Sequence, residues 1–311
     1  ASGRSAPYAS LLEAAAGIEA PDVSTLKLKS RPEEFRLLGR FVPGVDNPKI
    51  LTGQPLFGAD VRLEGMLYAV FEKCPVFGGK VRRANVEDIR KLPGVTHAFV
   101  VEGTDRLNGL MPGVAIVGPG WWQVDAARRQ LKVDWQTTHS DSTESYQARA
   151  AELAGQEGQV QRHDGDVGAA LDAAKTVVEA SYYYPFVSHA NMEPQYCTAW
   201  YHGSGRMELW APSQNPKSGR SLISSTLGIA EKDIHVNLTR IGGGFGRKLT
   251  NDFMVEAAWI AREVKRPVQL QWSREDDMRH DHYRPAAWHH FRAGLDKDGR
   301  MSAFDHHFVT F

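Results

Sequence analysis

Apolar and polar residues alternate over eight positions from 234 to 241, in the sequence IHVNLTRI. This period of two predicts a half-buried β-strand. Four glycines occupy the five positions 242–246 that follow, and residues 253–265 then show apolar side chains at mixed spacings of three and four, without glycine or proline. That spacing predicts an α-helix. Three residues can serve as its N-cap: Thr250, Asn251 and Asp252.

The glycine loop between this strand and helix is suited to a bound anion. Glycines let the backbone adopt positive φ and approach a ligand closely, and a loop that opens a helix offers N–H groups at the positive end of the helix dipole. Arg247 and Lys248 add two cations at the same place. The spacing excludes a P-loop and a dinucleotide fingerprint, because both would need glycine where Arg247 stands. A tight turn without a ligand is the alternative, although one or two glycines would suffice for it.

The pattern along the rest of the chain predicts four segments. Residues 1–37 form a helix over 8–16, which Gly17 can end, and a polar linker. Residues 38–136 form an α/β unit, residues 137–165 a polar linker with one exposed helix, and residues 166–311 a strand-rich unit. Strands are predicted at 66–76, 95–101, around 116, at 131–135, 176–186, in a hairpin over 197–213, at 267–273 and on either side of 297–299. Further helices are predicted at 85–92, 122–129, 146–153, 167–174 and 216–227.

Composition excludes several classes of protein. Hydrophobic residues make up 42% of the 311 residues, which is enough for a core, and 37 basic against 37 acidic residues leave a net charge near zero. Nucleic acid is therefore not an expected partner, since it needs a basic face. The sequence contains no apolar run long enough for a membrane span, and its opening ASGRSAPYAS is not a signal peptide.

Cys74 and Cys197 are the only cysteines. Two thiols cannot form a disulfide framework or hold an iron–sulfur cluster. Two buried free thiols are favoured over a single bridge.

Histidines occur in close pairs at 280 and 282, at 289–290 and at 306–307. None of these pairs has the spacing of a zinc site, and neighbouring side chains of a strand point to opposite faces. We therefore expect surface or hydrogen-bonded histidines, with no metal ligands in the chain.

Two polar segments lie at predicted element boundaries. Met192–Gln195 is either a plain turn or a segment that contacts a ligand, and the pattern leaves both open. Gln214 lies where a strand meets helix 216–227, on the same kind of edge as the glycine loop. Because α/β folds bind ligands at such edges, Gln214 is predicted to face the same anion as 243–246.

Several motifs in order resemble the molybdenum-binding large subunits of the xanthine oxidase family. The nearer resemblance is to the isoquinoline 1-oxidoreductase beta-subunit branch, which includes membrane-associated aldehyde dehydrogenases. The motifs are HANMEPQYCTAWY at 189–201, APSQN at 211–215, IGGGFGRK at 241–248 and SREDDMRHDHYRP at 273–285. Residues 52–81 also resemble the α/β hammerhead domain of that family. The resemblance implies an α+β fold, with a hammerhead domain over 38–136 and part of the first molybdopterin-binding domain over 166–311.

The resemblance also implies a chemistry. It implies a molybdopterin cofactor, usually the cytosine dinucleotide form in bacteria, and oxidation of an aldehyde or N-heteroaromatic compound with water as the oxygen source. The implied partners are a small subunit with [2Fe–2S] clusters and a cytochrome c as electron acceptor. Carried over by motif, Gln214 would hydrogen-bond a molybdenum oxygen. The implied cofactor-binding residues are Gln214, Gly243, Gly244, Phe245, Gly246 and Arg247.

Two departures from the family pattern change what is expected of this chain. Purine-oxidising relatives have glutamate after Gly-Gly-Lys, whereas this chain has Arg247, Lys248 and Leu249, which argues against a purine substrate. The catalytic glutamate of the family lies near the end of the full subunit and has no counterpart here. Because the apolar strand pattern also continues to Phe311, we expect a portion of a longer subunit that is inactive and without cofactor when alone.

Two other hypotheses stay open at this point. A non-catalytic binding or assembly module could keep the fold without the chemistry. An unrelated nucleotide-binding protein would explain only the glycine loop. Localisation in the periplasm follows from the resemblance alone, with the cytoplasm as the alternative.

Overall fold

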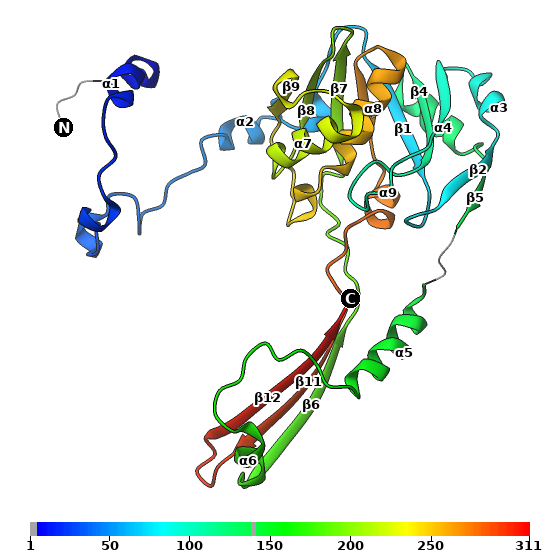
Figure 1. Ribbon diagram of the computed structural model, residues 1–311. Helices are drawn as coiled ribbons and strands as arrows, with labels where there is room; N and C mark the ends of the chain where they lie inside the picture. The colour runs from blue at the N-terminus through cyan, green and yellow to red at the C-terminus, as the bar shows by residue number, and fades with distance from the viewer. Residues whose placement is uncertain (1–4, 138–140) are drawn as a thin grey trace. The chain divides into compact units, whose positions relative to one another are not determined.

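The computed structural model describes residues 5–137 and 141–311 (Figure 1). Parts of two predicted linker segments, residues 1–4 and 138–140, lie outside the described residues. Contacts divide the chain into two units, Ala1–Gln54 and Pro55–Phe311. The predicted division into segments at 38, 137 and 166 stays a prediction.

The N-terminal unit consists of short helical turns joined by extended chain. Its α-helices are α1 (Leu12–Ala16) and α2 (Asn47–Leu51), and its 3-10 turns span Tyr8–Leu11, Val23–Thr25 and Pro32–Glu34. The predicted helix over 8–16 is confirmed, and Gly17 ends it. None of the described residues of this unit is buried, so they form no hydrophobic core.

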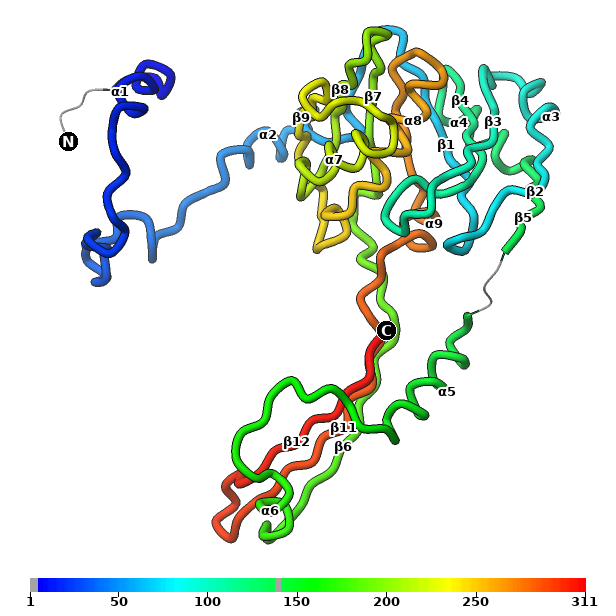
Figure 2. Tube along the Cα trace, in the orientation of Figure 1, coloured from blue at the N-terminus to red at the C-terminus, as the bar shows by residue number. Residues whose placement is uncertain are grey.

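A mixed seven-stranded sheet organises the second unit (Figures 1 and 2). Its strand order is β3-β4-β1-β10-β7-β8-β9. The strands are β1 (Leu67–Lys73), β3 (His97–Val101), β4 (Gly113–Gly118), β7 (Tyr196–His202), β8 (Arg206–Ala211), β9 (Ile234–Leu238) and β10 (Val268–Gln271). β1 pairs with β10 and β8 with β9 in parallel, and the other neighbours are antiparallel. Every strand of this sheet overlaps a stretch predicted to contain one.

The sheet contains strands from both predicted α/β segments. β1 comes from the segment 38–136 and β10 from the segment 166–311, and Leu67 lies opposite Val268 across their parallel pair. The backbone hydrogen bonds of the two segments are therefore continuous across one sheet, which the linear pattern of the sequence did not predict.

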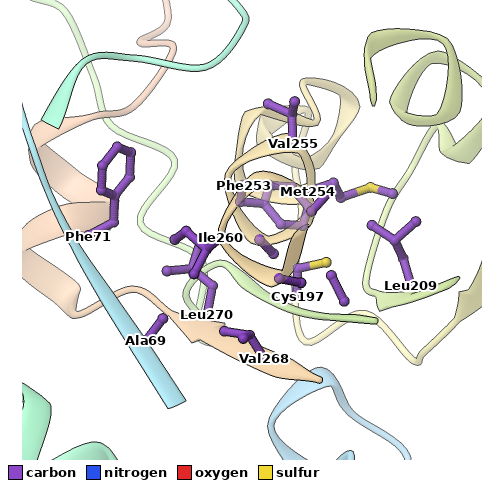
Figure 3. Close-up of a cluster of buried hydrophobic side chains, with 14 of the residues drawn as sticks. Ala69, Phe71, Cys197, Leu209, Phe253, Met254, Val255, Ile260, Val268 and Leu270 are labelled. Carbon is purple, nitrogen blue, oxygen red and sulfur yellow. The ribbon is translucent and has the colours of Figure 1, made fainter. Parts of the chain in front are cut away.

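Helix α8 (Asp252–Val264) fills the core on one face of the sheet (Figure 3). Asn251 is its N-cap residue, one of the three candidates. Ten of its 13 residues are buried, because apolar positions lie almost all round it. Figure 3 shows Phe253 and Ile260 of this helix beside Cys197 and Leu270 of the sheet. Helix α7 (Pro216–Leu227) packs against α8 and ends where predicted.

The opposite face of the sheet is covered at one end by α3 (Val86–Arg90) and α4 (Trp121–Arg128). Side chains alternate across a strand. Ala69 and Phe71 of β1 therefore join the core around α8, while Val70 between them joins a second cluster with Val124 of α4.

Two smaller sheets and their helices complete the unit. One pairs β2 (Lys80–Ala84) with β5 (Val133–Gln136), and the other has the order β12-β11-β6 (Figure 2). The bounds of the second sheet are β6 (Thr176–Tyr184), β11 (Ala287–Leu295) and β12 (Met301–Thr310). Helices α5 (Thr143–Ala154) and α6 (Val167–Asp172) contact β12. Helix α9 (Arg274–Arg279) and the 3-10 turns Gly58–Asp60, Glu231–Asp233 and Arg247–Leu249 were not predicted.

Cys74 and Cys197 are both buried free thiols, as predicted. Burial raises the pKa of the Cys197 thiol, which keeps it protonated. Across the described residues, the helices are all too short or too polar to cross a membrane.

Candidate functional site

The parallel strands β8 and β9 end at the same edge of the sheet, and the segments that follow them meet there. Gln214 lies between β8 and α7, and the glycine loop 242–246 lies between β9 and α8. The N–H of Gln214 donates to the carbonyl of Lys248 at 2.9 Å. The N–H of Gly246 donates to Gln214 Oε1 at 3.1 Å. Gln214 and the loop are therefore in direct contact.

The loop has a conformation that leaves three of its amides without an internal hydrogen bond. Gly243 and Gly246 adopt φ of 102° and 109°, and Phe245 adopts 54°, a conformation that a residue with a side chain seldom takes. The N–H groups of Gly243, Gly244 and Phe245 donate no hydrogen bond to any described residue. The same holds for Gln214 Nε2, so four donors at this edge have no hydrogen-bond partner within the described structure.

The Arg247 side chain does not reach this edge, which corrects the expectation of an available cation. Its guanidinium is buried and bonds the Asp252 carboxylate at 2.9 and 2.8 Å, and its Nε lies 3.1 Å from Asp281. Burial acts to raise the pKa of Asp252, but Arg247 outweighs it and the pKa is lowered. Since a buried charge must be paired, the guanidinium is held by these two carboxylates and does not offer its charge to a ligand at the loop.

Lys248 is also buried, and its contacts show what Glu193 does in the segment 192–195, which the sequence pattern left open as a turn or a ligand contact. Lys248 Nζ lies 2.8 Å from Glu193 Oε2 and 3.1 Å from the Glu193 carbonyl. The same carboxylate accepts from the N–H of Gly242 at 2.8 Å and from that of Gly58 at 3.1 Å. Burial lowers the pKa of Lys248, and Glu193 opposes that shift. The Glu193 carboxylate therefore fixes the start of the loop, and both of its oxygens are engaged in these hydrogen bonds.

The segment before Glu193 brings a histidine to the other side of the loop. His189 Nδ1 lies 3.1 Å from Asp281 Oδ1, and its side chain is 8% exposed. A Cβ added to Gly246 would lie 3.4 Å from His189 Nε2. The ring edge that is not bonded to Asp281 therefore lies against Gly246.

The side chain of Asn191, beside the same loop, has no polar partner among the described residues. It is completely buried, and neither Oδ1 nor Nδ2 has a hydrogen-bond partner among the described residues. A Cβ added to Gly243 would lie 3.7 Å from Asn191 Cβ. Ala190 beside it has φ of 42°. A buried amide without a hydrogen-bond partner costs free energy. Residues with strained backbone conformations are found most often at functional sites. This segment therefore has two features of a binding site.

Three of the four histidines in the pairs 289–290 and 306–307 are hydrogen-bonded, as expected, whereas His307 Nε2 has no partner among the described residues. His289 Nδ1 lies 2.7 Å from His306 Nε2, and His290 Nδ1 lies 2.9 Å from Ser181 Oγ. No group of three potential metal-ligating side chains occurs within 5–137 and 141–311.

Sequence reasoning found Gln214 and the glycines but assigned no role to His189 or Asp281. These two residues are 92 positions apart, and no spacing rule joins them. One local signal was present for the helix that precedes Asp281. Ser273 is the N-cap of α9 and accepts a hydrogen bond from the N–H of Asp276 at 3.2 Å, so the sequence could have predicted where that helix begins.

Comparison with known proteins gives a consistent result. The molybdopterin cofactor-binding domain family matches residues 150–310. The chain is 33% identical over 301 residues to isoquinoline 1-oxidoreductase subunit beta of Brevundimonas diminuta, covering 92% of this chain and 37% of that protein. It is 28% identical over 289 residues to a membrane-bound aldehyde dehydrogenase of Gluconacetobacter polyoxogenes, covering 90% and 37%. The chain thus spans less than half the length of these relatives.

Solved structures share the fold. The aldehyde oxidoreductase of Desulfovibrio gigas matches with a TM-score of 0.70 at 18% identity, over 86% of this chain and 34% of that one. Quinoline 2-oxidoreductase of Pseudomonas putida 86 matches with a TM-score of 0.67 at 19% identity, over 86% and 38%. The mixed α/β architecture described above therefore corresponds to part of such large subunits.

Proposed function

Because the chain belongs to the xanthine oxidase family and corresponds to a portion of its molybdopterin-binding large subunit, we propose that it is part of a molybdenum hydroxylase. The proposed reaction is the oxidation of an aldehyde or N-heteroaromatic compound with water as the oxygen source. The observation that carries the proposal is the hydrogen bond of 3.1 Å between the N–H of Gly246 and Gln214 Oε1. It joins the two motifs at which the resemblance places the cofactor.

The loop fits an anionic pterin cofactor. The amides of 243–245 and Gln214 Nε2 are donors without partners among the described residues, and such donors suit anionic oxygens. A Cβ at Gly244 would lie 2.8 Å from Gln214 Cδ, so the absence of a side chain at 244 leaves room for Gln214. When bound, molybdopterin would supply the molybdenum centre that accepts electrons from the substrate. We propose the cytosine dinucleotide form by resemblance.

The residues of this chain would hold and orient the cofactor and would not transfer the proton. Gln214 Oε1 is held by Gly246, which leaves Nε2 to donate. Arg247 contributes its backbone to the loop, while its side chain is bonded to Asp252. The base would lie in the remainder of the same subunit, so the isolated chain is expected to be inactive.

The substrate class rests on two supports. The similar proteins carry names that refer to isoquinoline and aldehyde oxidation. Leu249, which is 50% exposed, occupies the position of the glutamate of purine-oxidising relatives and offers no carboxylate to a purine. We propose a small [2Fe–2S] subunit as the electron-transfer partner, because Cys74 and Cys197 are both buried and cannot hold a cluster.

The test uses the complete subunit that contains this chain, purified with its iron–sulfur partner. Molybdenum is measured by mass spectrometry, and oxidation of benzaldehyde and of isoquinoline is measured with an artificial electron acceptor. The proposal expects about one molybdenum per subunit and activity on at least one of the two compounds. Gln214→Ala is expected to lower kcat roughly 100-fold by removing one positioned donor. A folded subunit without molybdenum would instead support the non-catalytic module.

Gln147→Ala is the matched control, because Gln147 is an exposed glutamine of α5. It should leave both metal content and kcat unchanged. The isolated 311-residue chain should contain no molybdenum and oxidise neither compound. Activity in that preparation would overturn the assignment of the base to the rest of the subunit.

A further inference from the structure

His189 lies where a ligand at the glycine loop would meet it, and no role has been assigned to it above. We infer that His189 is a further ligand-contacting residue, whose Nε2 accepts a hydrogen bond from an O–H or N–H of the group bound at 243–246. Asp281 is the positioning residue that fixes its ring. This inference rests on the proposed function, because it takes the loop to be the binding site.

Asp281 holds the whole segment that carries the histidine. Its Oδ2 accepts from the Ser188 hydroxyl at 2.8 Å and from the backbone N–H of His189 at 2.6 Å. His189 Nδ1 lies 3.1 Å from Oδ1 and 3.2 Å from Oδ2 of the same carboxylate. Backbone and ring are thus fixed together, so the direction of Nε2 is set before a ligand arrives.

The charge on Asp281 decides which ring nitrogen carries the proton. Its carboxylate is 1% exposed and forms an ion pair with the Arg247 guanidinium, with Oδ1 3.1 Å from Nε. An ionised carboxylate only accepts hydrogen bonds, so Nδ1 must be the protonated nitrogen. In the neutral ring, Nε2 is then left with a lone pair directed away from Asp281.

That lone pair lies against the loop. A Cβ at Gly246 would be 3.4 Å from Nε2, and Gly246 itself adopts a φ of 109° that favours glycine. Nε2 has no hydrogen-bond partner among the described residues. Asn191 lies two residues further along with its Cβ beside Gly243, and its fully buried amide has no hydrogen-bond partner among the described residues. The segment therefore brings the unpartnered Nε2 of His189 to the loop and carries a second unpartnered polar side chain.

His189 and the loop offer opposite hydrogen-bonding groups to a ligand. The amides of 243–245 and Gln214 Nε2 offer donors only, so they suit acceptor oxygens. His189 Nε2 offers an acceptor beside them. A ligand that presents both anionic oxygens and one proton-bearing oxygen or nitrogen would satisfy both sets. Hydrogen phosphate is the simplest probe of that class, and sulfate is the matching anion without a proton.

The experiment records nitrogen-15 and proton NMR spectra of the 311-residue chain near pH 8, where an ordinary histidine is neutral. Histidine ring nitrogens and the amides of 243–246 are observed, and His189→Gln identifies the His189 signals among the 12 histidines. We expect the Nδ1–H tautomer in the free protein. Phosphate should shift both the loop amides and Nε2, whereas sulfate should shift the loop amides alone.

Affinities give a second readout. His189→Gln should weaken phosphate binding roughly 5- to 10-fold, which corresponds to one hydrogen bond, and leave sulfate binding unchanged. Ser181→Ala is the control, because it removes a hydroxyl that bonds Nδ1 of a histidine outside the site, His290, at 2.9 Å. It should keep the tautomer and both affinities.

The outcomes separate the two levels of the proposal. An Nε2–H tautomer, or loop amides that shift with phosphate while Nε2 does not, would overturn the role of His189 and leave the loop site standing. An Nε2 that becomes protonated when either anion is added would overturn the role of that nitrogen as an acceptor. Loop amides that respond to neither anion would overturn the anion site of the proposed function itself.

Discussion

The ammonium of Lys73 lies 3.1 Å from the carboxylate of Glu256, and both side chains are withdrawn from solvent. Lys73 comes from β1 and Glu256 from α8, so the pair joins the two predicted α/β segments. Trp272 completes the group, since its Nε1 donates to the other Glu256 oxygen at 2.9 Å and its ring lies 3.0 Å from Lys73 Nζ. Burial raises the pKa of Glu256 to about 7 and lowers that of Lys73.

The first prediction concerns the pH dependence of stability at Glu256. Its folded pKa of about 7 lies above the ordinary glutamate pKa of 4.5, so the native state binds more protons between these pH values. Stability contributed by this group therefore falls as pH rises from about 4.5 to about 7. The Glu256→Gln variant has no titrating carboxyl at this position, so it does not lose that stability as pH rises. Its free energy of unfolding, relative to the wild type, should rise on the order of 2 kcal/mol between pH 5 and pH 8.

Denaturant unfolding of both proteins at several pH values measures this difference. Subtraction removes the histidines and the other carboxylates and leaves the Lys73–Glu256 pair. Without Glu256 the pKa of Lys73 falls further, which changes the difference in the same direction. Glu263→Gln, on the exposed side of the same helix, is the matched control and should change stability by less than about 0.5 kcal/mol at each pH. A difference between Glu256→Gln and the wild type that stays constant from pH 5 to pH 8 would contradict the prediction.

Local pattern was sufficient to predict most elements of the second unit. The alternation in 234–241 predicted β9 and the spacing in 253–265 predicted α8, because period alone distinguishes a strand from a helix. The pattern could not predict that β10 lies beside β1, some 200 residues away in sequence, since parallel neighbours carry no local signal.

The site was predictable to the same extent. Gln214 and the glycine loop follow adjacent parallel strands, so the edge rule predicted their contact. The direction of Arg247 was not predictable, because it depends on Asp252 and Asp281, which only the folded core brings under the loop. The contact of His189 with Asp281 was missed for the same reason.

The second prediction contrasts two glycines of the loop. A Cβ at Gly242 would lie 2.5 Å from Glu193 Cβ, which cannot move without its backbone, so Gly242→Ala should lower the free energy of unfolding by about 1 to 3 kcal/mol. A Cβ at Gly244 would meet only the flexible end of Gln214, at 2.8 Å from Cδ. Gly244→Ala should therefore cost little stability but displace the Gln214 side chain from Gly246.

Denaturant unfolding measures the first effect, and the amide resonance of Gly246 with the side-chain resonances of Gln214 measures the second. Gly203→Ala is the control, because a Cβ at 203 would meet nothing within 4 Å in the described structure. It should change neither quantity. Equal destabilisation by the substitutions at 242 and 244 would show that the loop does not hold Gln214 as described.

The third prediction concerns the hydrogen bonds of the Glu193 carboxylate. Glu193→Gln keeps the shape of the side chain but removes its charge. Its NH2 group would lie against both Lys248 Nζ and the N–H of Gly242, which share Oε2 at 2.8 Å each, or against the N–H of Gly58, which bonds Oε1 at 3.1 Å. Breaking this nearly buried pair should lower the free energy of unfolding by about 3 kcal/mol. Removing the cation as well, in Glu193→Gln with Lys248→Met, should recover part of that loss, because no unpaired ammonium then stays buried.

Denaturant unfolding of the two single variants and the double variant completes a cycle for the pair. Glu179→Gln is the matched control, since Glu179 bonds Arg292 at 2.9 Å with both side chains more than half exposed, and such pairs contribute less than about 1 kcal/mol. Additive losses in the double variant would mean that Glu193 acts on Gly242 and Gly58 alone. The expected non-additivity would instead make the salt bridge with Lys248 the contact that holds the start of the glycine loop in place.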